Sequence, residues 1–160
     1  MLKHLLMRLP ALDRKSAKLI AEHNEMIDFQ GGILLGKFGA GISRRSEAIV
    51  SKQISNGKNI QLFLAQRAGS SYLGYKAKIA EIYSDYREYS GELKLPSYYQ
   101  ERPSSVFVLS GKLENADLSN LLLESNERPL IDVLSITRTP VMMVVDRDEL
   151  LSTRTASSVV

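Results

Sequence analysis

The spacing of hydrophobic residues changes along the first forty positions, and the change predicts a helix followed by a strand. Residues 11–27 carry apolar side chains among charged ones, and Pro10 suits a first helical turn, so we expect a helix here. The next segment, Gly32 to Phe38, reads GILLGKF and is short, apolar and flanked by glycines. Such a segment is typical of a buried strand.

A second helix is predicted after a glycine-containing turn. Ser43 is a plausible N-cap, because its hydroxyl can accept a hydrogen bond from a free backbone N–H of the first turn. We expect Ala48 and Ile49 to face the core. The helix should end near Ile54, because both residues of the Asn56-Gly57 pair tolerate the left-handed conformation of a C-terminal cap.

Alternating side chains predict a β-hairpin in the middle of the chain. Ile60, Leu62 and Leu64 alternate with residues of other types. After a loop at 67–71, a second extended run follows from Tyr72 to Tyr83. Strict alternation in this second run gives two faces, with Tyr75, Ala77, Ile79 and Glu81 on one and Lys76, Lys78, Ala80 and Ile82 on the other.

The second half of the chain is predicted to contain short elements around one long loop. Residues 84–103 lack periodicity and contain four tyrosines, which indicates a loop of a kind that is often functional. The other expected elements are a strand at 106–109, a short helix at 118–123, a strand or helix–strand junction at 130–136, a strand at 141–145 and a turn capped by Asp146 and Glu149. Together they predict an α+β domain with a mainly antiparallel, barrel-like sheet and flanking helices.

Length and composition are those of an ordinary globular domain. The chain has 160 residues, of which 44% are hydrophobic, so we expect one core. It contains no cysteine, which excludes disulfides, thiol catalysis and zinc held by cysteine. Residues 1–9 are apolar but interrupted by charged residues, and they are too short for a signal peptide or a membrane span. We therefore expect a cytoplasmic protein without a membrane partner.

Charge is distributed unevenly along the chain. The formal net charge is +3, but residues 37–78 hold eight basic residues and one acid, whereas residues 79–160 hold eight basic and thirteen acidic groups. A cationic region near aromatic side chains favours a polyanion, because Lys and Arg displace counterions from phosphates and rings stack on bases. The alternative is a solvated basic helix face. The residues predicted to contact nucleic acid are Lys37, Arg44, Arg45, Lys52, Arg67, Lys76 and Lys78.

Patterns for catalysis and metal binding are weak. His4 and His23 have neither metal-ligand nor triad spacing, and we predict no metal and no cofactor. The turn at 36–43 (GKFGAGIS) has the glycines and final serine of a phosphate-binding P-loop, but Ile42 replaces the essential lysine. Two interpretations remain: the turn approaches a phosphate through free backbone N–H groups, or it serves topology alone.

The order of the segments resembles one known superfamily. A strand and a glycine-containing turn lead into a basic helix, followed by a hairpin of the form NIQLFLAQ and SYLGYKAKIAEIY, a strand VFVLSG, a short leucine-rich helix, Pro129-Leu130 and a closing VMMVVDRDELL. This order resembles the PUA-like superfamily, most nearly its EVE and ASCH branches. Unlike EVE-type readers, which often use tryptophan, the chain has none. The expected division is a helical extension at 1–30, a PUA-like domain at 31–151 and a polar tail at 152–160.

The resemblance implies a β-barrel that binds DNA or RNA and often holds one flipped, sometimes modified, base in a cavity. Such domains commonly serve in RNA metabolism or in modification-dependent restriction and defence. A flipped base needs an aromatic or apolar sandwich and polar groups for its edge. The candidate base-pocket residues are Phe38, Ser43, Ser70, Ser71, Tyr72, Tyr75, Tyr98 and Tyr99, and Asp132 would read an edge unless it is buried and paired near Arg138.

Three functions remain open at this point. The first is a nucleic-acid-binding module without catalysis. The second is an enzyme on the same fold, since some ASCH-like domains resemble small hydrolases or ribonucleases, for which the chain offers Lys37, Lys76, Tyr75 and Glu81. The third is a protein-interaction domain or assembly subunit, whose acidic second half and leucine-rich helix face a partner.

Overall fold

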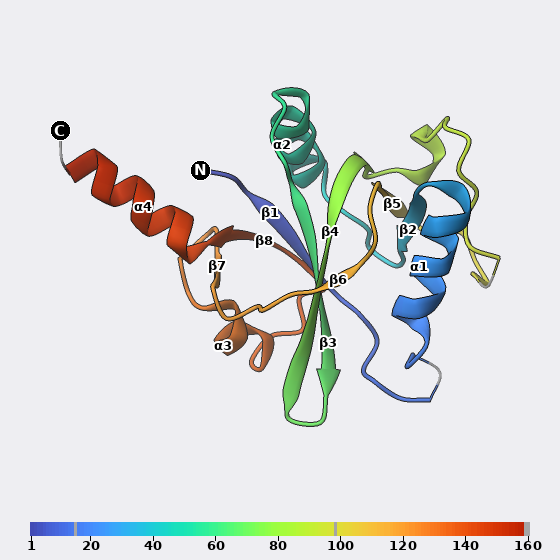
Figure 1. Cartoon of the computed structure of the whole chain (residues 1–160), viewed down its shortest axis with the longest axis horizontal. Helices are drawn as coiled ribbons and strands as arrows, with labels where there is room; N and C mark the ends of the chain where they lie inside the picture. Colours follow the sequence, from blue (N-terminus) through green and yellow to red (C-terminus); the bar gives the residue numbers. More distant parts are fainter. Residues whose placement is uncertain (15, 98, 159–160) are drawn as a thin grey trace.

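A computed structural model describes residues 1–14, 16–97 and 99–158 of the chain. These residues form a mixed sheet of eight strands with four α-helices around it, which confirms the predicted α+β class (Figure 1). The strands are β1 (His4–Arg8), β2 (Ile33–Lys37), β3 (Gln61–Ala68), β4 (Ser71–Tyr83), β5 (Ser105–Leu109), β6 (Glu114–Asn115), β7 (Leu121–Leu123) and β8 (Val141–Asp146). The helices are α1 (Leu19–Gln30), α2 (Arg44–Ser55), α3 (Leu130–Leu134) and α4 (Arg147–Ser158), with a 3-10 turn η1 (Tyr86–Glu88).

The sheet is mainly antiparallel but open. Its strand order is β2-β5-β4-β3-β1-β8-β7, with β6 on β4, and the parallel pair is β1 with β3. The predicted barrel is wrong, because within the described residues the end strands β2 and β7 do not pair with each other. The outer edge of β2 is instead covered by the segment around residue 99: the backbone N–H of Gly36 donates to the Tyr99 hydroxyl at 2.9 Å.

The hairpin of β3 and β4 is confirmed, but the alternation in β4 changes along the strand. β4 pairs with β3 through its first half and with β5 through its second half, and the register shifts between Ile79 and Glu81. An extra residue at such a bulge reverses which face the following side chains occupy. Ile82 is therefore buried in the same core as Ala77 and Ile79, whereas strict alternation predicted that it shares the face of the lysines.

Strand β1 lies near the middle of the sheet, where a helical extension was predicted. It pairs with β3 on one side and β8 on the other, and neighbouring residues Leu5 and Leu6 are both fully buried, in two different clusters. A strand covered on both faces shows no alternation, so its pattern resembles a short apolar run. The predicted helix begins only at Leu19, and the Pro10 carbonyl, in the preceding loop, accepts a hydrogen bond from the Gln66 side chain.

Helices cover the two faces of the sheet. Ile27 of α1 and Val50 of α2 belong to the cluster that contains Leu5, and α3 packs on the cluster that contains Leu6. The predicted caps of α2 are confirmed, since the Ser43 hydroxyl accepts from the Ser46 N–H and Asn56-Gly57 ends the helix. The predicted inner face was wrong: Ala48 is exposed and Ile49 is only half-buried.

Three predictions for the C-terminal third need correction. Strand β7 replaces the short helix expected at 118–123, while residues 130–134 form the helix α3. The Asp146 carboxylate accepts from the N–H groups of residues 148 and 149, which confirms the expected cap. The helix that it starts, α4, continues to Ser158, through most of the predicted polar tail, and extends away from the sheet (Figure 1).

Candidate nucleic-acid interface

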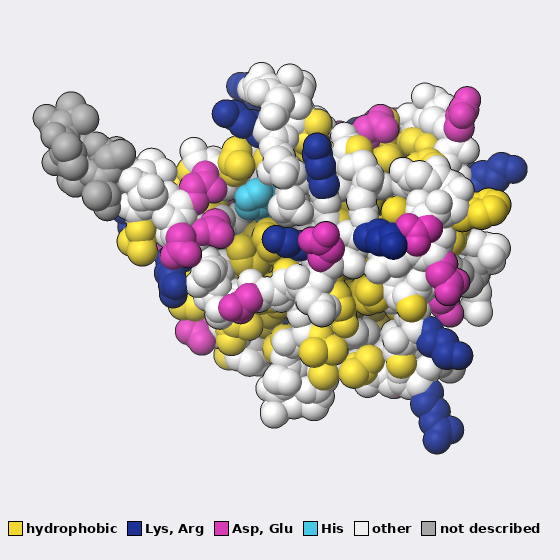
Figure 2. All heavy atoms as spheres, in the orientation of Figure 1, with side chains coloured by type: hydrophobic (Ala, Val, Ile, Leu, Met, Phe, Trp, Pro, Cys, Tyr) yellow, Lys and Arg dark blue, Asp and Glu magenta, His cyan; other side chains and the backbone are white. Residues whose placement is uncertain are grey.

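The basic residues of the 37–78 segment do not form one continuous cationic surface. Figure 2 shows Lys and Arg side chains next to Asp and Glu side chains across one face of the molecule. Arg45 lies 3.7 Å from Glu124, which also pairs with Lys3 at 2.9 Å. Acidic residues from the second half of the chain therefore neutralise part of the charge that the sequence concentrates in the first half.

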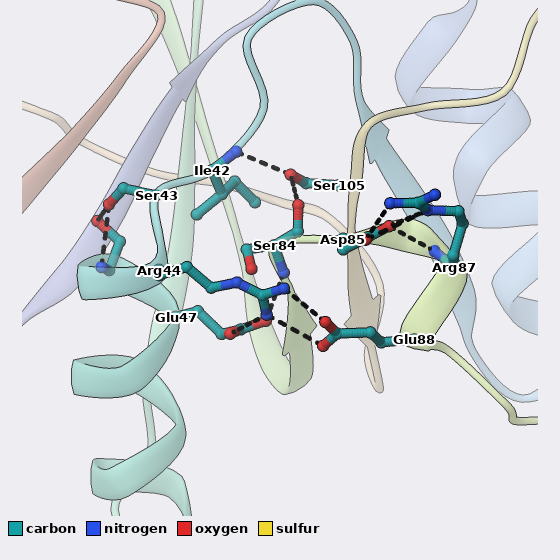
Figure 3. A network of polar contacts seen from close by, with 10 residues as sticks. Ile42, Ser43, Arg44, Glu47, Ser84, Asp85, Arg87, Glu88 and Ser105 are labelled. Carbon is teal, nitrogen blue, oxygen red and sulfur yellow. Dashed lines mark hydrogen bonds and ion pairs between the residues drawn. The ribbon is translucent and has the colours of Figure 1, made fainter.

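Arg44 is held in a network at the start of α2 (Figure 3). Its guanidinium donates to both carboxylate oxygens of Glu88, at 3.1 and 2.5 Å, and to Glu47 at 3.1 Å. These contacts raise the pKa of Arg44 and lower the pKa of Glu88. Two carboxylates therefore already bind both terminal amino groups of Arg44.

The same network fixes the glycine-containing turn before α2. The Ser105 hydroxyl accepts from the Ile42 N–H at 2.8 Å and donates to the Ser84 carbonyl at 2.6 Å (Figure 3). Gly41 adopts a positive φ of 73°, and a side chain there would collide with the Ser105 hydroxyl. Of the two interpretations of this turn, its contacts favour a role in topology.

The predicted lysines of α2 and β4 lie on two different elements. Lys52 is exposed on α2, and Lys76 and Lys78 lie on β4 opposite Phe63 and Gln61 of β3. Within the described chain none of these three side chains makes an ion pair. They offer charge on the surface but line none of the cavities described below.

Three arginines line one cavity, here called the arginine pocket, with a volume of about 470 Å³. Its position follows from topology: β1 and β3 run parallel, so their C-terminal ends lie at the same edge of the sheet, and Arg8 pairs with Ala65. The loop after α3 closes the other side. The lining residues are Arg8, Leu9, Ala11, Ala65, Arg67, Tyr72, Leu134, Ser135, Ile136, Thr137 and Arg138.

The charge of this pocket is not neutralised by carboxylates. None of its described lining residues is acidic, and Arg8, Arg67 and Arg138 make no ion pair within the described chain. Within the described chain the Arg67 side chain uses only its Nε, which donates to the Gly69 carbonyl at 3.1 Å. Both terminal amino groups of Arg67, and the whole exposed guanidinium of Arg138, remain as donors.

Arg8 is the most rigid of the three. Its Nε donates to the Thr139 carbonyl at 3.0 Å, and its Nη2 donates to the carbonyls of Leu134 and Thr137 at 3.1 and 2.6 Å. These bonds satisfy the carbonyl of the last residue of α3 and carbonyls of the loop that follows, so Arg8 has a structural role. They leave its Nη1 as a donor in a fixed position.

A second cavity, here called the aromatic pocket, shares the lining residues Arg8 and Leu9 with the first. Its Met7 and Leu35 belong to the cluster that contains Leu5, whereas Ala65 and Leu134 of the arginine pocket belong to the cluster on the other face of the sheet. It measures about 350 Å³, and mainly apolar residues of β1, α1 and β2 line it together with Lys37, Phe38 and Tyr99. The Phe38 and Tyr99 rings meet edge to face with centroids 5.2 Å apart. Burial raises the pKa of the Tyr99 hydroxyl, which keeps it protonated.

The other candidate base-pocket residues are spread over the molecule. Tyr72 lies in the arginine pocket, where its hydroxyl donates to the Leu134 carbonyl at 3.0 Å, and Tyr75 is half-buried against the core. The Ser43 hydroxyl caps α2, and Ser70 and Ser71 lie at the turn of the hairpin. The prediction for Tyr98 falls outside the described residues.

Asp132 does not fit either interpretation that the sequence suggested. It is exposed on α3, where burial near Arg138 was the alternative to edge reading, and its carboxylate has no ion pair within the described chain. It does not line the arginine pocket or the aromatic pocket.

Sequence reasoning missed Arg8, Arg138 and His23 as cavity residues. The available signal was the position of Arg8 directly after a buried apolar run, which marks a strand end. His23 is buried and lines the aromatic pocket, and burial lowers its pKa, so the imidazole is held neutral.

Within the described residues there is no group of three or more His, Asp or Glu side chains that could hold a metal ion.

The comparisons with known proteins leave the geometry as the basis for a functional proposal. No helix among the described residues has the length and apolar character needed to cross a membrane. No protein-family model matches the chain, and no curated protein matches it significantly.

Proposed function

We propose that this chain is a nucleic-acid-binding module that places a phosphate in the arginine pocket and a base in the aromatic pocket. The observation that carries the proposal is a cavity with three arginines and no acidic residue in its described lining. Guanidinium groups match phosphate oxygens in geometry and charge. A hollow of about 470 Å³ has the size of a ligand site.

The adjacent aromatic pocket supports the same proposal. Because the two cavities share Arg8 and Leu9 at the end of β1, a nucleic acid that passes around this end of the sheet would place a phosphate in one cavity and a base in the other. The 5.2 Å separation of the Phe38 and Tyr99 rings leaves no slot between them. A base in this pocket would therefore stack against Phe38 instead of entering between two rings.

The PUA-like resemblance belongs to this proposal as well. The order from β2 through β5 and the mainly antiparallel sheet support it. The open sheet, the added strand β1 and the strand β7 in place of the short leucine-rich helix depart from the pattern of that superfamily. A flipped or modified base, in DNA or RNA, and a role in restriction or defence follow from the resemblance alone. They define which nucleic acids belong in the first binding assay.

A catalytic function receives less support from the same residues. Tyr75 and Lys76 are neighbours on β4 and so face opposite sides of the strand. Lys37 lines the aromatic pocket, while Glu81 lines a separate groove beside α2 and accepts from the Tyr83 hydroxyl at 2.6 Å. The four residues are spread over different surfaces, which favours binding without catalysis.

Fluorescence anisotropy with single-stranded and duplex DNA and RNA, with and without modified bases, tests the proposal. We expect binding that weakens steeply with salt, with each phosphate contact adding about 0.7–0.9 to the slope of log K against log salt. Phe38→Ala should cost about 1–3 kcal/mol in binding with little change in slope. Phe29→Ala is the matched control, because Phe29 is 93% exposed on α1 and lines neither pocket.

The absence of binding to every one of these nucleic acids at about 50 mM salt would contradict the proposal. The protein-interaction or assembly function would then take its place.

A further inference from the structure

We infer that the arginine pocket recognises a terminal phosphate monoester, the phosphorylated end of a nucleic-acid strand, in preference to an internal phosphodiester. The inference rests on the proposed function and specifies which part of the nucleic acid enters the pocket. Three features of the pocket carry it: its charge, its free donors and its closed floor.

The charge of the pocket suits a dianion. A terminal phosphate carries a charge of about −1.5 to −2 near neutral pH, whereas a phosphodiester within a strand carries a single negative charge. Three guanidinium groups line the pocket, and none of the described lining residues is acidic. A monoester therefore compensates more of this positive charge than an internal phosphate does.

The free donors also match a terminal group. Among the described residues, both terminal amino groups of Arg67, the whole guanidinium of Arg138 and Nη1 of Arg8 make no hydrogen bond. A monoester presents three terminal oxygens, each a strong acceptor. An internal phosphodiester has two such oxygens, because its other two oxygens are bonded to sugars.

The floor of the pocket favours the end of a nucleic-acid strand over an internal segment of that strand. Ala65 and Leu134, which are 1% and 2% exposed, lie at its base. The loop after β1, the hairpin of β3 and β4 and the loop after α3 contribute the sides. An internal phosphate needs space for the nucleic-acid strand to enter and leave, whereas a terminal phosphate needs only one opening.

The test compares three oligonucleotides of the same sequence. Each has about 12 nucleotides, a length in the range of a single-strand binding site. The first carries a 5′-phosphate, the second a 3′-phosphate, and the third a hydroxyl at both ends. We expect the full-length protein to bind one phosphorylated strand about tenfold or more tightly than the hydroxyl strand, because charged hydrogen bonds are strong. The ratio of the two dissociation constants is the readout, and the better-bound strand identifies the end that is recognised.

Arg67→Gln and Arg138→Gln should each reduce this ratio toward one. Both residues are exposed, so the variants are expected to fold, and thermal unfolding checks this. Arg128→Gln is the matched control, because Arg128 is an exposed arginine outside the pocket, without an ion pair in the described chain, and it should keep the ratio. An undiminished ratio in both pocket variants would overturn the inference.

A measurement on the unmodified protein gives an independent check. The second ionisation of a phosphate monoester has a pKa of about 6, so the preference should decline as the pH falls from about 7.5 to about 5. The hydroxyl-ended strand at each pH corrects for changes in the protein itself. A preference that does not change over this range would contradict recognition of the dianion.

The outcomes separate this inference from the function on which it rests. Equal, salt-dependent affinity for the phosphorylated and hydroxyl strands would overturn the inference and leave the proposed function intact. No binding to any strand would overturn both. A mononucleotide that competes as strongly as the phosphorylated strand would show that the ligand is a free nucleotide. That result would overturn recognition of a strand end.

Discussion

The N-terminal region of α2 and the arginine pocket both display arginines, but they use the charge differently. Arg44 donates to Glu47 and Glu88, and Arg45 lies near Glu124. In the arginine pocket Arg67 and Arg138 contact no carboxylate within the described chain. The number of basic residues in a segment therefore says less about ligand binding than the number of carboxylates that the fold brings to them.

The comparison also shows why the two regions differ in their roles. The partners of Arg44 come from its own helix and from η1, so its bonds join two elements of the fold. Within the described chain the Arg67 side chain bonds only the turn of its own hairpin, and Arg138 lies in the loop after α3. The first region acts as a structural clamp, and the second leaves its donors available.

The largest expected effect is on nucleic-acid affinity. The double variant Arg67→Gln with Arg138→Gln should weaken binding on the order of a hundredfold at low salt, because two charged contacts are lost, and should reduce the salt slope. The double variant Arg44→Gln with Arg45→Gln removes the same charge. Its loss of affinity should exceed the loss caused by the lower net charge alone by less than about twofold. Comparable losses in the two variants would remove the distinction between the regions.

The next effect is on stability. Ser105→Ala should lower the free energy of unfolding by about 1–3 kcal/mol, because the buried hydroxyl joins the Ile42 N–H to the Ser84 carbonyl and its loss leaves both unpaired. Ser104→Ala is the control, since Ser104 is exposed and bonds one carbonyl. Urea unfolding measures both, and an equal loss in the two variants would contradict a buried junction at Ser105.

The smallest effect concerns pH. Hydrogen bonding to Arg44 lowers the folded-state pKa of Glu88, so its contribution to stability is present above the unfolded-state pKa of about 4.3 and is lost as the pH falls through the folded value. The difference in stability between the wild type and Glu88→Gln should therefore shrink in acid. A difference that stays constant from about pH 7 to about pH 3 would show that the ion pair contributes nothing.

Local elements were predictable from the sequence, and elements defined by distant contacts were not. The caps of α2 and the hairpin turn depend on neighbouring residues such as Ser43 and Asn56, which the pattern reveals. β1 was missed because burial on both faces removes alternation, and the bulge near Ala80 was missed because it reflects a change of partner from β3 to β5.

Some residues of the candidate site were predicted from the sequence, and others were not. Lys37, Phe38 and Tyr99 were predicted, and the fold brings them to one cavity. Arg67 and Tyr72 were predicted as well, yet their companion Arg8 comes from the unpredicted central strand and Arg138 from the loop after α3. Neutralisation of Arg44 by Glu88 was equally invisible, because the carboxylate arrives from a loop far along the sequence.

The most direct test of an available arginine pocket follows the arginine side-chain Nε–Hε signals by NMR while a short phosphorylated oligonucleotide is added. Chemical shifts report the contacts of each guanidinium separately, so the two regions are compared in one experiment. We expect the signals of Arg67 and Arg138 to move with added ligand while that of Arg44 stays in place. Movement at Arg44, with Arg67 and Arg138 unchanged, would contradict this expectation.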